Sequence, residues 1–125
     1  MDPLALLQAY VSAHNAGVRT GDYSSLVALL AQNAQMHFEG LPVGPFVGRD
    51  EVARAFAKDP PGAELVVLEA RSEGDAAVAL YGWQGAAAVF AGALTITGAG
   101  GKIKQILVRA AGAVTPRGSP AKPPP

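Results

Sequence analysis

The residues of this chain best suited to proton-transfer chemistry are His37 and Glu39, which lie two positions apart in the run Gln35–Gly40. In a β-strand, residues two positions apart point to the same side of the sheet, so an imidazole and a carboxyl group would face together. Burial in an apolar pocket raises the pKa of a carboxyl group towards neutrality, where it can act as a general base. If this side of the strand faces a pocket, Glu39 is the expected base, and either member of the His37–Glu39 pair could relay a proton.

The opposite orientation of this short strand is the alternative. Met36 and Phe38 would then fill the core, and His37 and Glu39 would be solvated at a strand end. The hydrophobic pattern alone slightly favours this second arrangement. The sequence leaves the choice open.

A second pair of polar aromatic residues is expected on the first helix. Asp2 can cap a helix whose first turn contains Pro3. Tyr10 and His14 lie four positions apart and would share one side of that helix. They are either a phenol donor and an imidazole in a pocket, or two partly buried, hydrogen-bonded aromatic residues at the edge of an amphipathic helix.

Composition narrows the class of protein. The 125 residues include 10 basic and 10 acidic side chains without a basic block, so we expect no nucleic-acid partner. There is no cysteine and no pair of histidines at metal-binding helical spacing, so we expect no metal and no cofactor. No apolar run approaches the roughly 20 residues that span a bilayer. We therefore expect a cytoplasmic protein that does not enter the membrane.

The order of elements predicts an α+β fold with one domain over residues 1–111. The first helix should stop near Gly17, the Asp59-Pro60-Pro61 run should end the third, and residues 112–125 form a Pro-rich tail expected to be flexible. Four late strands at meander spacing favour a curved, mostly antiparallel sheet with the helices on its concave face. The expected helices are 3–17, 23–31 and 49–58, and the expected strands are 34–39, 63–71, 76–83, 86–97 and 102–110.

This order resembles the nuclear transport factor 2-like superfamily, and more narrowly its SnoaL-like and ketosteroid-isomerase-like branch. The resemblance covers roughly residues 4–110. It implies a cone-shaped α+β barrel of three N-terminal helices and a curved sheet around an apolar pocket, commonly a homodimer through the sheet. The residues that carry it are Tyr10–Gly17 (YVSAHNAG), Leu26–Ala31 (LVALLA), Gly48–Val52 (GRDEV) with Phe56, and Gly100–Ile103 (GGKI).

The resemblance also implies roles for individual residues. Tyr10 falls on the position of a hydrogen-bond donor to a developing oxyanion. Glu39 falls on the position of the base when counted back from Gly48, whereas Phe38 falls there when counted forward from Leu29. The position of a second, acidic donor falls near Ala93, which cannot donate a hydrogen bond.

These observations predict a pocket for a small hydrophobic molecule. The first hypothesis is a cofactor-independent isomerase acting on a steroid- or polyketide-like carbonyl compound, with Glu39, Tyr10 and His37 as catalytic residues. The second is a non-catalytic ligand-binding or dimerisation module of the same fold. The residues expected to contact a substrate are His14, Phe38, Phe56 and Trp83. Tyr81 shares a strand face with Trp83 and could wall the pocket or pack a dimer sheet.

Overall fold

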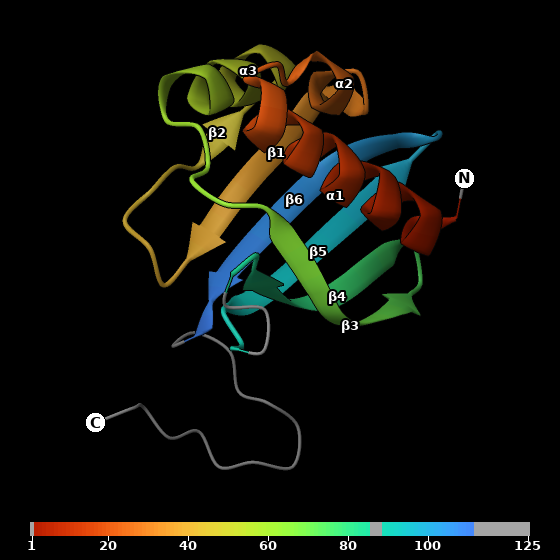
Figure 1. The fold of residues 1–125 in the computed structure, drawn as a ribbon. Coiled ribbons are helices and arrows are strands. Elements are labelled where there is room, and N and C mark those ends of the chain that lie inside the picture. Colours follow the sequence, from red (N-terminus) through yellow and green to blue (C-terminus); the bar gives the residue numbers. More distant parts are fainter. Residues whose placement is uncertain (1, 86–88, 112–125) are drawn as a thin grey trace.

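Residues 2–85 and 89–111 are described by a computed structural model, which has the expected α+β architecture (Figure 1). The tail predicted over 112–125 and the first residues of the strand predicted over 86–97 lie outside the described residues. No helix in the described ranges is long and apolar enough to cross a membrane. In chain order the elements are α1 (Pro3–Thr20), α2 (Ser24–Val27), β1 (Leu30–Glu39), β2 (Phe46–Val47), α3 (Arg49–Lys58), β3 (Leu65–Glu73), β4 (Ala76–Trp83), β5 (Gly92–Ala99) and β6 (Lys102–Ala110).

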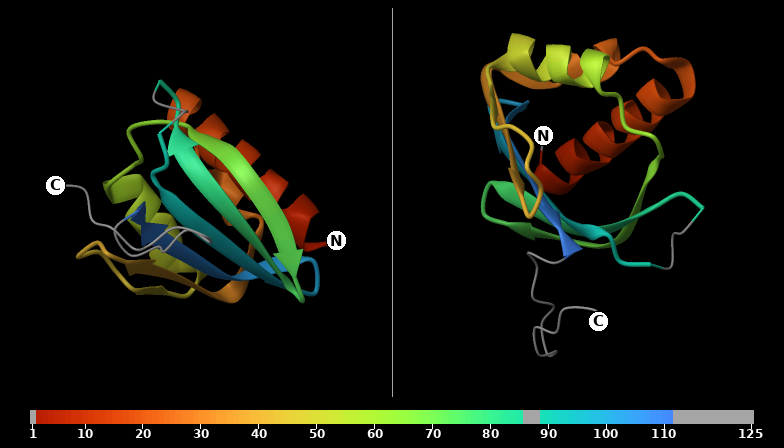
Figure 2. Two further views of the ribbon diagram at one scale, coloured as in Figure 1. Left: turned by 90° about the horizontal axis from the view of Figure 1, so that it is seen from below. Right: turned by 90° about the vertical axis from the view of Figure 1, so that its left-hand side faces the viewer.

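The six strands form one open, curved sheet in the order β2-β1-β6-β5-β4-β3. Strands β3 to β6 form the predicted antiparallel meander, whereas β1 joins the sheet parallel to β6. All three helices lie on one face: α1 runs across β3, β4 and β5, and α3 packs on β1 and β2 (Figure 2). The chain therefore encloses the space between its helices and a concave sheet.

Helix α1 begins and ends with local hydrogen bonds. The Asp2 carboxylate accepts from the backbone N–H groups of Leu4 and Ala5, as its capping position predicts. The prediction that the helix stops at Gly17 is wrong, because α1 continues to Thr20 and ends at Gly21, whose φ of 80° is the left-handed conformation of a glycine cap. Gly17 is instead buried within the helix, with the ring of Tyr23 against its Cα.

The helix predicted over 23–31 is much shorter than expected. Only Ser24–Val27 is helical, and β1 already begins at Leu30. The backbone N–H of Ile103 donates to the carbonyl of Leu29 at 2.8 Å, and Leu30 then pairs with Ile103 in the sheet. Pairing with β6, which is distant in the sequence, thus overrides the local helical pattern of leucine and alanine.

The third helix agrees with its prediction in both bounds, Arg49 and Lys58. Asp50 and Glu51 occupy its first turn, where negative charge is favourable, and Asp59 with the prolines after it ends the helix. Val52 and Phe56 are its buried side chains. This helix brings Phe56 over the concave face of the sheet.

Candidate functional site

A cavity of about 470 Å³ opens between the helices and the concave face of the sheet. Its walls are mainly aliphatic and aromatic, with a few polar groups, which is the usual character of a small-molecule site. The residues that line it are Tyr10, His14, Met36, Phe38, Leu41, Val43, Phe46, Ala55, Phe56, Lys58, Asp59, Pro61, Leu65, Tyr81, Trp83, Leu94 and Val108.

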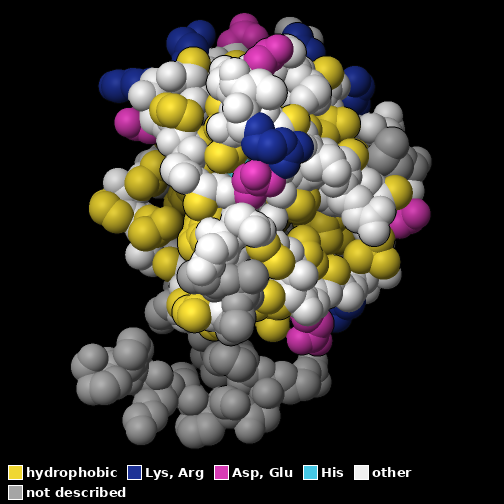
Figure 3. All heavy atoms as spheres, viewed as in Figure 1, with side chains coloured by type: hydrophobic (Ala, Val, Ile, Leu, Met, Phe, Trp, Pro, Cys, Tyr) yellow, Lys and Arg dark blue, Asp and Glu magenta, His cyan; other side chains and the backbone are white. Residues whose placement is uncertain are grey.

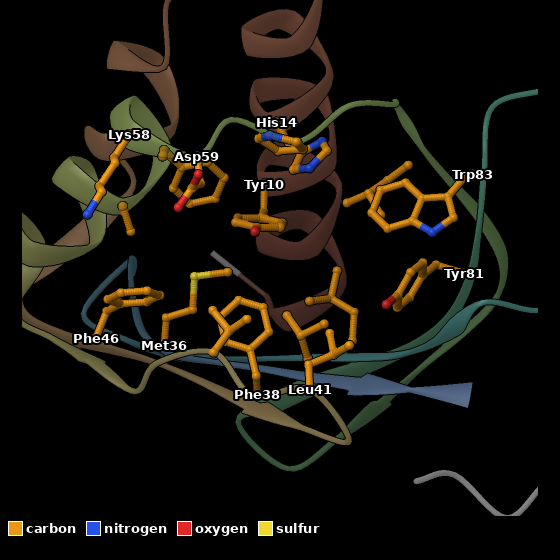
Figure 4. Close-up of a pocket in the computed structure, with 17 residues that line it drawn as sticks. Tyr10, His14, Met36, Phe38, Leu41, Phe46, Lys58, Asp59, Tyr81 and Trp83 are labelled. Carbon is orange, nitrogen blue, oxygen red and sulfur yellow. The ribbon is translucent and has the colours of Figure 1, made fainter. Parts of the chain in front are cut away.

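Helix α1 supplies two polar side chains to this cavity. Tyr10 and His14, one helical turn apart, project from the same side of α1 into it (Figure 4), with their ring centroids 6.2 Å apart. They are 2% and 4% exposed, so both lie deep among apolar neighbours. Of the two interpretations of this pair, the one in which a phenol and an imidazole face a pocket is the arrangement observed.

Strand β1 turns Met36 and Phe38, and not His37 and Glu39, towards the cavity. The two pairs of residues alternate along the strand. The carboxylate of Glu39 accepts a hydrogen bond of 2.9 Å from Nε of Arg109, with the two side chains 47% and 44% exposed. The prediction that Glu39 and His37 act together in the pocket is wrong for this structure, because both lie on the outer face of the sheet.

The register of the sheet accounts for this orientation. Phe38 pairs with Val108, which pairs with Leu94, and all three side chains line the cavity. Glu39 pairs with Arg109, one residue further along each strand, so its side chain points to the opposite face. A register shift between Leu30 and Gln35 sets this orientation, so counting residues from the two sides of β1 gave different answers.

The four residues expected to contact the ligand all line the cavity. Ring centroids of Phe56 and Trp83 lie 6.3 Å and 6.4 Å from that of His14, so the imidazole lies between two aromatic side chains. Phe38 lies edge-on to Phe46 at 6.2 Å. These four residues therefore lie in the pocket, as predicted from the sequence, and their contact with a ligand stays a prediction.

Tyr81, for which the sequence left open a place in the pocket wall or in a dimer sheet, is a further polar residue of the cavity. It is 4% exposed, lines the cavity and lies edge-on to Trp83 at 5.4 Å. It comes from β4 and lies below Trp83, to one side of Tyr10 and His14 (Figure 4). Its alternation with Trp83 was the available signal. Tyr81 thus gives the cavity a second phenol group. Ala93, the position of the second donor in the family's isomerases, does not line the cavity, whereas its neighbour Leu94 does.

Burial controls the protonation of these side chains. Desolvation lowers the pKa of His14 below its usual value, opposed by its hydrogen bond with Asn15 and by the charge of Glu64. Desolvation raises the pKa of Tyr10, with smaller effects of Tyr81 and Tyr23, and raises that of Tyr81. Near neutral pH the cavity therefore contains a neutral imidazole and two phenols that keep their protons.

His14 is held by its neighbour in the chain. Nδ1 of His14 lies 2.9 Å from Oδ1 of Asn15. The Asn15 amide also joins the start of β3: its Nδ2 donates to the carbonyl of Leu65 at 2.9 Å, and its Oδ1 accepts from the N–H of Leu65 at 2.7 Å. The imidazole is thus connected to both α1 and the sheet, and its Nε2 is the ring nitrogen left for the cavity.

The mouth of the cavity combines charged and apolar groups. Lys58 and Asp59 lie at the end of α3 and reach its rim, while Leu41 and Val43 in the β1–β2 connection are 45% and 44% exposed. Figure 3 shows hydrophobic side chains at the left, lower and right-centre parts of this face, with charged side chains along the top, in a pair of opposite charges near the centre and singly at the edges. An apolar molecule would meet a hydrophobic rim before it reached the tyrosines and His14.

The site offers proton donors and a proton acceptor rather than a set of metal ligands. Within residues 2–85 and 89–111 no three histidine or acidic side chains come together in a way that could hold a metal ion. Two phenol groups can donate hydrogen bonds to a carbonyl oxygen, and a neutral imidazole can accept a proton. This combination suits acid–base chemistry on a bound carbonyl compound.

Comparison with known proteins agrees with this architecture. Residues 9–106 match the SnoaL-like domain. No curated protein sequence matches the chain significantly. A protein from Sphaerobacter thermophilus superposes with a TM-score of 0.68 at 23% identity, over 88% of this chain and 96% of its own.

Two other similar structures have names that indicate a reaction. A Kribbella flavida protein provisionally named a ketosteroid isomerase has a TM-score of 0.67 at 19% identity, over 97% of this chain and 81% of its own. A Jannaschia protein provisionally named a SnoaL-like polyketide cyclase has a TM-score of 0.65 at 14% identity, over 85% of this chain and 83% of its own. A nuclear transport factor 2-like protein from Cytophaga hutchinsonii superposes equally well, with a TM-score of 0.66 at 15% identity, over 86% of this chain and 88% of its own, and at these identities the likeness shows this fold alone.

Proposed function

This chain belongs to the SnoaL-like domain family, and we propose that its cavity binds a small hydrophobic carbonyl compound, steroid- or polyketide-like, and performs general acid–base chemistry on it. The observation that carries this proposal is that Tyr10, His14 and Tyr81 line one cavity whose other buried lining residues are apolar. The names of the Kribbella and Jannaschia proteins support the same class of substrate.

The chemistry assigned to each residue follows from its protonation. The hydroxyl of Tyr10 or Tyr81 donates a hydrogen bond to the carbonyl oxygen and stabilises the negative charge that develops there. His14 takes a proton from the carbon next to the carbonyl and returns it to another position, which is an isomerisation. Neutral His14 replaces Glu39 in this role because Glu39 lies outside the cavity.

Binding without turnover is the second candidate function. With Glu39 on the outer face, Asp59 is the acidic residue among those that line the cavity, and it is exposed to solvent at the end of α3 rather than buried beside Tyr10 and His14. A ligand carrier with this fold would need the apolar walls and the tyrosine donors but no base. The two functions differ in whether the bound molecule exchanges protons.

The test is a screen followed by proton exchange. Steroids and aromatic polyketides that bind the native state raise its melting temperature. Each such compound is then incubated with the protein in D₂O, and the loss of its α-proton signal is followed by NMR. Exchange well above the buffer rate is the expected result. A bound ketone that exchanges no faster than in buffer indicates the carrier function, and the failure of every hydrophobic carbonyl compound to bind would overturn both.

A further inference from the structure

The orientation of the Asn15 amide is determined by the backbone of Leu65. A peptide N–H can only donate a hydrogen bond and a peptide carbonyl can only accept one. Because Leu65 presents both groups to Asn15, at 2.7 Å and 2.9 Å, the oxygen of the amide must face the N–H and the nitrogen must face the carbonyl. Reversing the amide would lose both bonds at once.

This orientation determines the tautomer of His14. The atom of Asn15 that lies 2.9 Å from Nδ1 of His14 is the amide oxygen, which can only accept. Nδ1 must therefore carry the proton, and in a neutral imidazole the other nitrogen then has a free lone pair. In the other neutral tautomer, with the proton on Nε2, the bare Nδ1 would face the Asn15 oxygen, and two acceptors would be in contact without a hydrogen bond.

We propose that Asn15 is a positioning residue that holds His14 as the Nδ1–H tautomer and leaves Nε2 as a proton acceptor for the cavity. The tautomer itself stands on the contacts of Asn15, while its use in catalysis rests on the proposed function. In the proposed reaction Nε2 gains the α-proton, and the imidazolium that forms keeps its Nδ1–H bond to Asn15.

The groups around His14 fit a neutral base. Tyr10 faces it from α1, Tyr81 and Asp59 line the same cavity from β4 and the end of α3, and Glu64 lies beside it before β3. The Glu64 carboxylate is bound at 2.6 Å by Arg19, which compensates its charge. The amide of Asn15, unlike a carboxylate, fixes the ring without adding a charge that would favour the protonated form.

The test reads the tautomer directly. In protein labelled with ¹⁵N at its histidines, a long-range ¹H–¹⁵N spectrum separates a protonated ring nitrogen from a bare one, and the chain has only two histidines, His14 and His37. His37→Gln assigns the signals. We expect Nδ1 of His14 to be protonated and Nε2 to be bare near neutral pH. A bare Nδ1 with a protonated Nε2 in the wild type would overturn the proposal.

Two variants of Asn15 test whether it causes the tautomer. Asn15→Asp keeps an acceptor for His14 and adds a charge, so we expect Nδ1–H to persist and the acid limb of any pH–rate profile to move to higher pH. Asn15→Ala removes the acceptor, and the two tautomers should then mix. If Asn15→Ala does not fold, the wild-type spectrum and Asn15→Asp still decide the question; an unchanged His14 pKa in Asn15→Asp would count against the role.

The matched control is Gln35→Ala. Oε1 of Gln35 lies 2.9 Å from Nε2 of His37 on the outer face of the sheet, so this change removes an amide from the other histidine. The His14 signals should not change. Because the spectrum needs no substrate, failure to find exchange would contradict the proposed function alone, whereas an Nε2–H tautomer in an active protein would contradict the positioning role alone.

Discussion

The ring of Tyr23 packs directly against the backbone of Gly17, three residues from His14 on helix α1. Tyr23 lies on the short segment before α2, and its ring centroid is 5.1 Å from that of Phe56. Gly17 therefore lets Tyr23 reach Phe56, one of the aromatic walls of the cavity, across the surface of α1. A glycine that normally weakens a helix is needed here for close packing.

Gly17→Ala should destabilise the fold despite the better helix propensity of alanine. Its Cβ would overlap the Tyr23 ring, and forced overpacking costs about 1–3 kcal/mol in the free energy of unfolding. Urea denaturation followed by circular dichroism measures the change. Gly62→Ala is the matched control, because a Cβ there meets nothing within 4 Å and its backbone is not in a left-handed conformation. Equal stability of Gly17→Ala and wild type would mean that Tyr23 packs elsewhere.

Glu39→Gln should have little effect on either stability or chemistry. The pair of Glu39 with Arg109 is exposed on both sides, and such pairs contribute roughly 0–1 kcal/mol. The measurement is the melting temperature together with the α-proton exchange rate of a bound ketone. A loss of exchange of about 10²-fold would restore Glu39 as the base and would require β1 to face the other way.

Acid should destabilise the protein through His14. Burial lowers the pKa of His14 in the native state below the usual 6.5, so as the pH falls below that value the unfolded chain takes up a proton before the native state does. The free energy of unfolding therefore falls from about pH 6.5 down to the native pKa of His14 and shows no further change from this group at lower pH.

The comparison of wild type with His14→Gln isolates this contribution, because the other titrating groups are common to both proteins. Denaturant unfolding at a series of pH values should show the wild type losing stability relative to the variant as the pH falls through this window. A difference that is constant with pH would mean that His14 titrates alike in both states.

Local signals predicted the elements whose bounds depend on neighbouring residues. The Asp59-Pro60-Pro61 stop placed the end of helix 49–58, and the meander spacing of the late strands placed the hairpin between β3 and β4. The prediction that the first helix ends at Gly17 was wrong because a glycine can either end a helix or leave space on its surface for a ring from elsewhere in the chain. Sequence alone does not show that Tyr23 lies there.

The site was predictable in part. Helical spacing placed Tyr10 and His14 together, and strand alternation linked Tyr81 with Trp83. The direction of β1 depended on a register shift against β6, about 70 residues away, so a motif count could not decide it. The contact of Asn15 with Leu65 joins residues 50 positions apart, and it is this contact that gives His14 its defined orientation.

The most direct test of the account compares His14→Gln with His37→Gln in the proton-exchange assay. Both variants replace an imidazole with an amide, but only His14 lines the cavity. For a ketone that binds both variants, His14→Gln should slow α-proton exchange by about 10²-fold or more, the usual contribution of a general base. His37→Gln should exchange at the wild-type rate. Exchange in His14→Gln within a few-fold of wild type would contradict the central claim that His14 is the base.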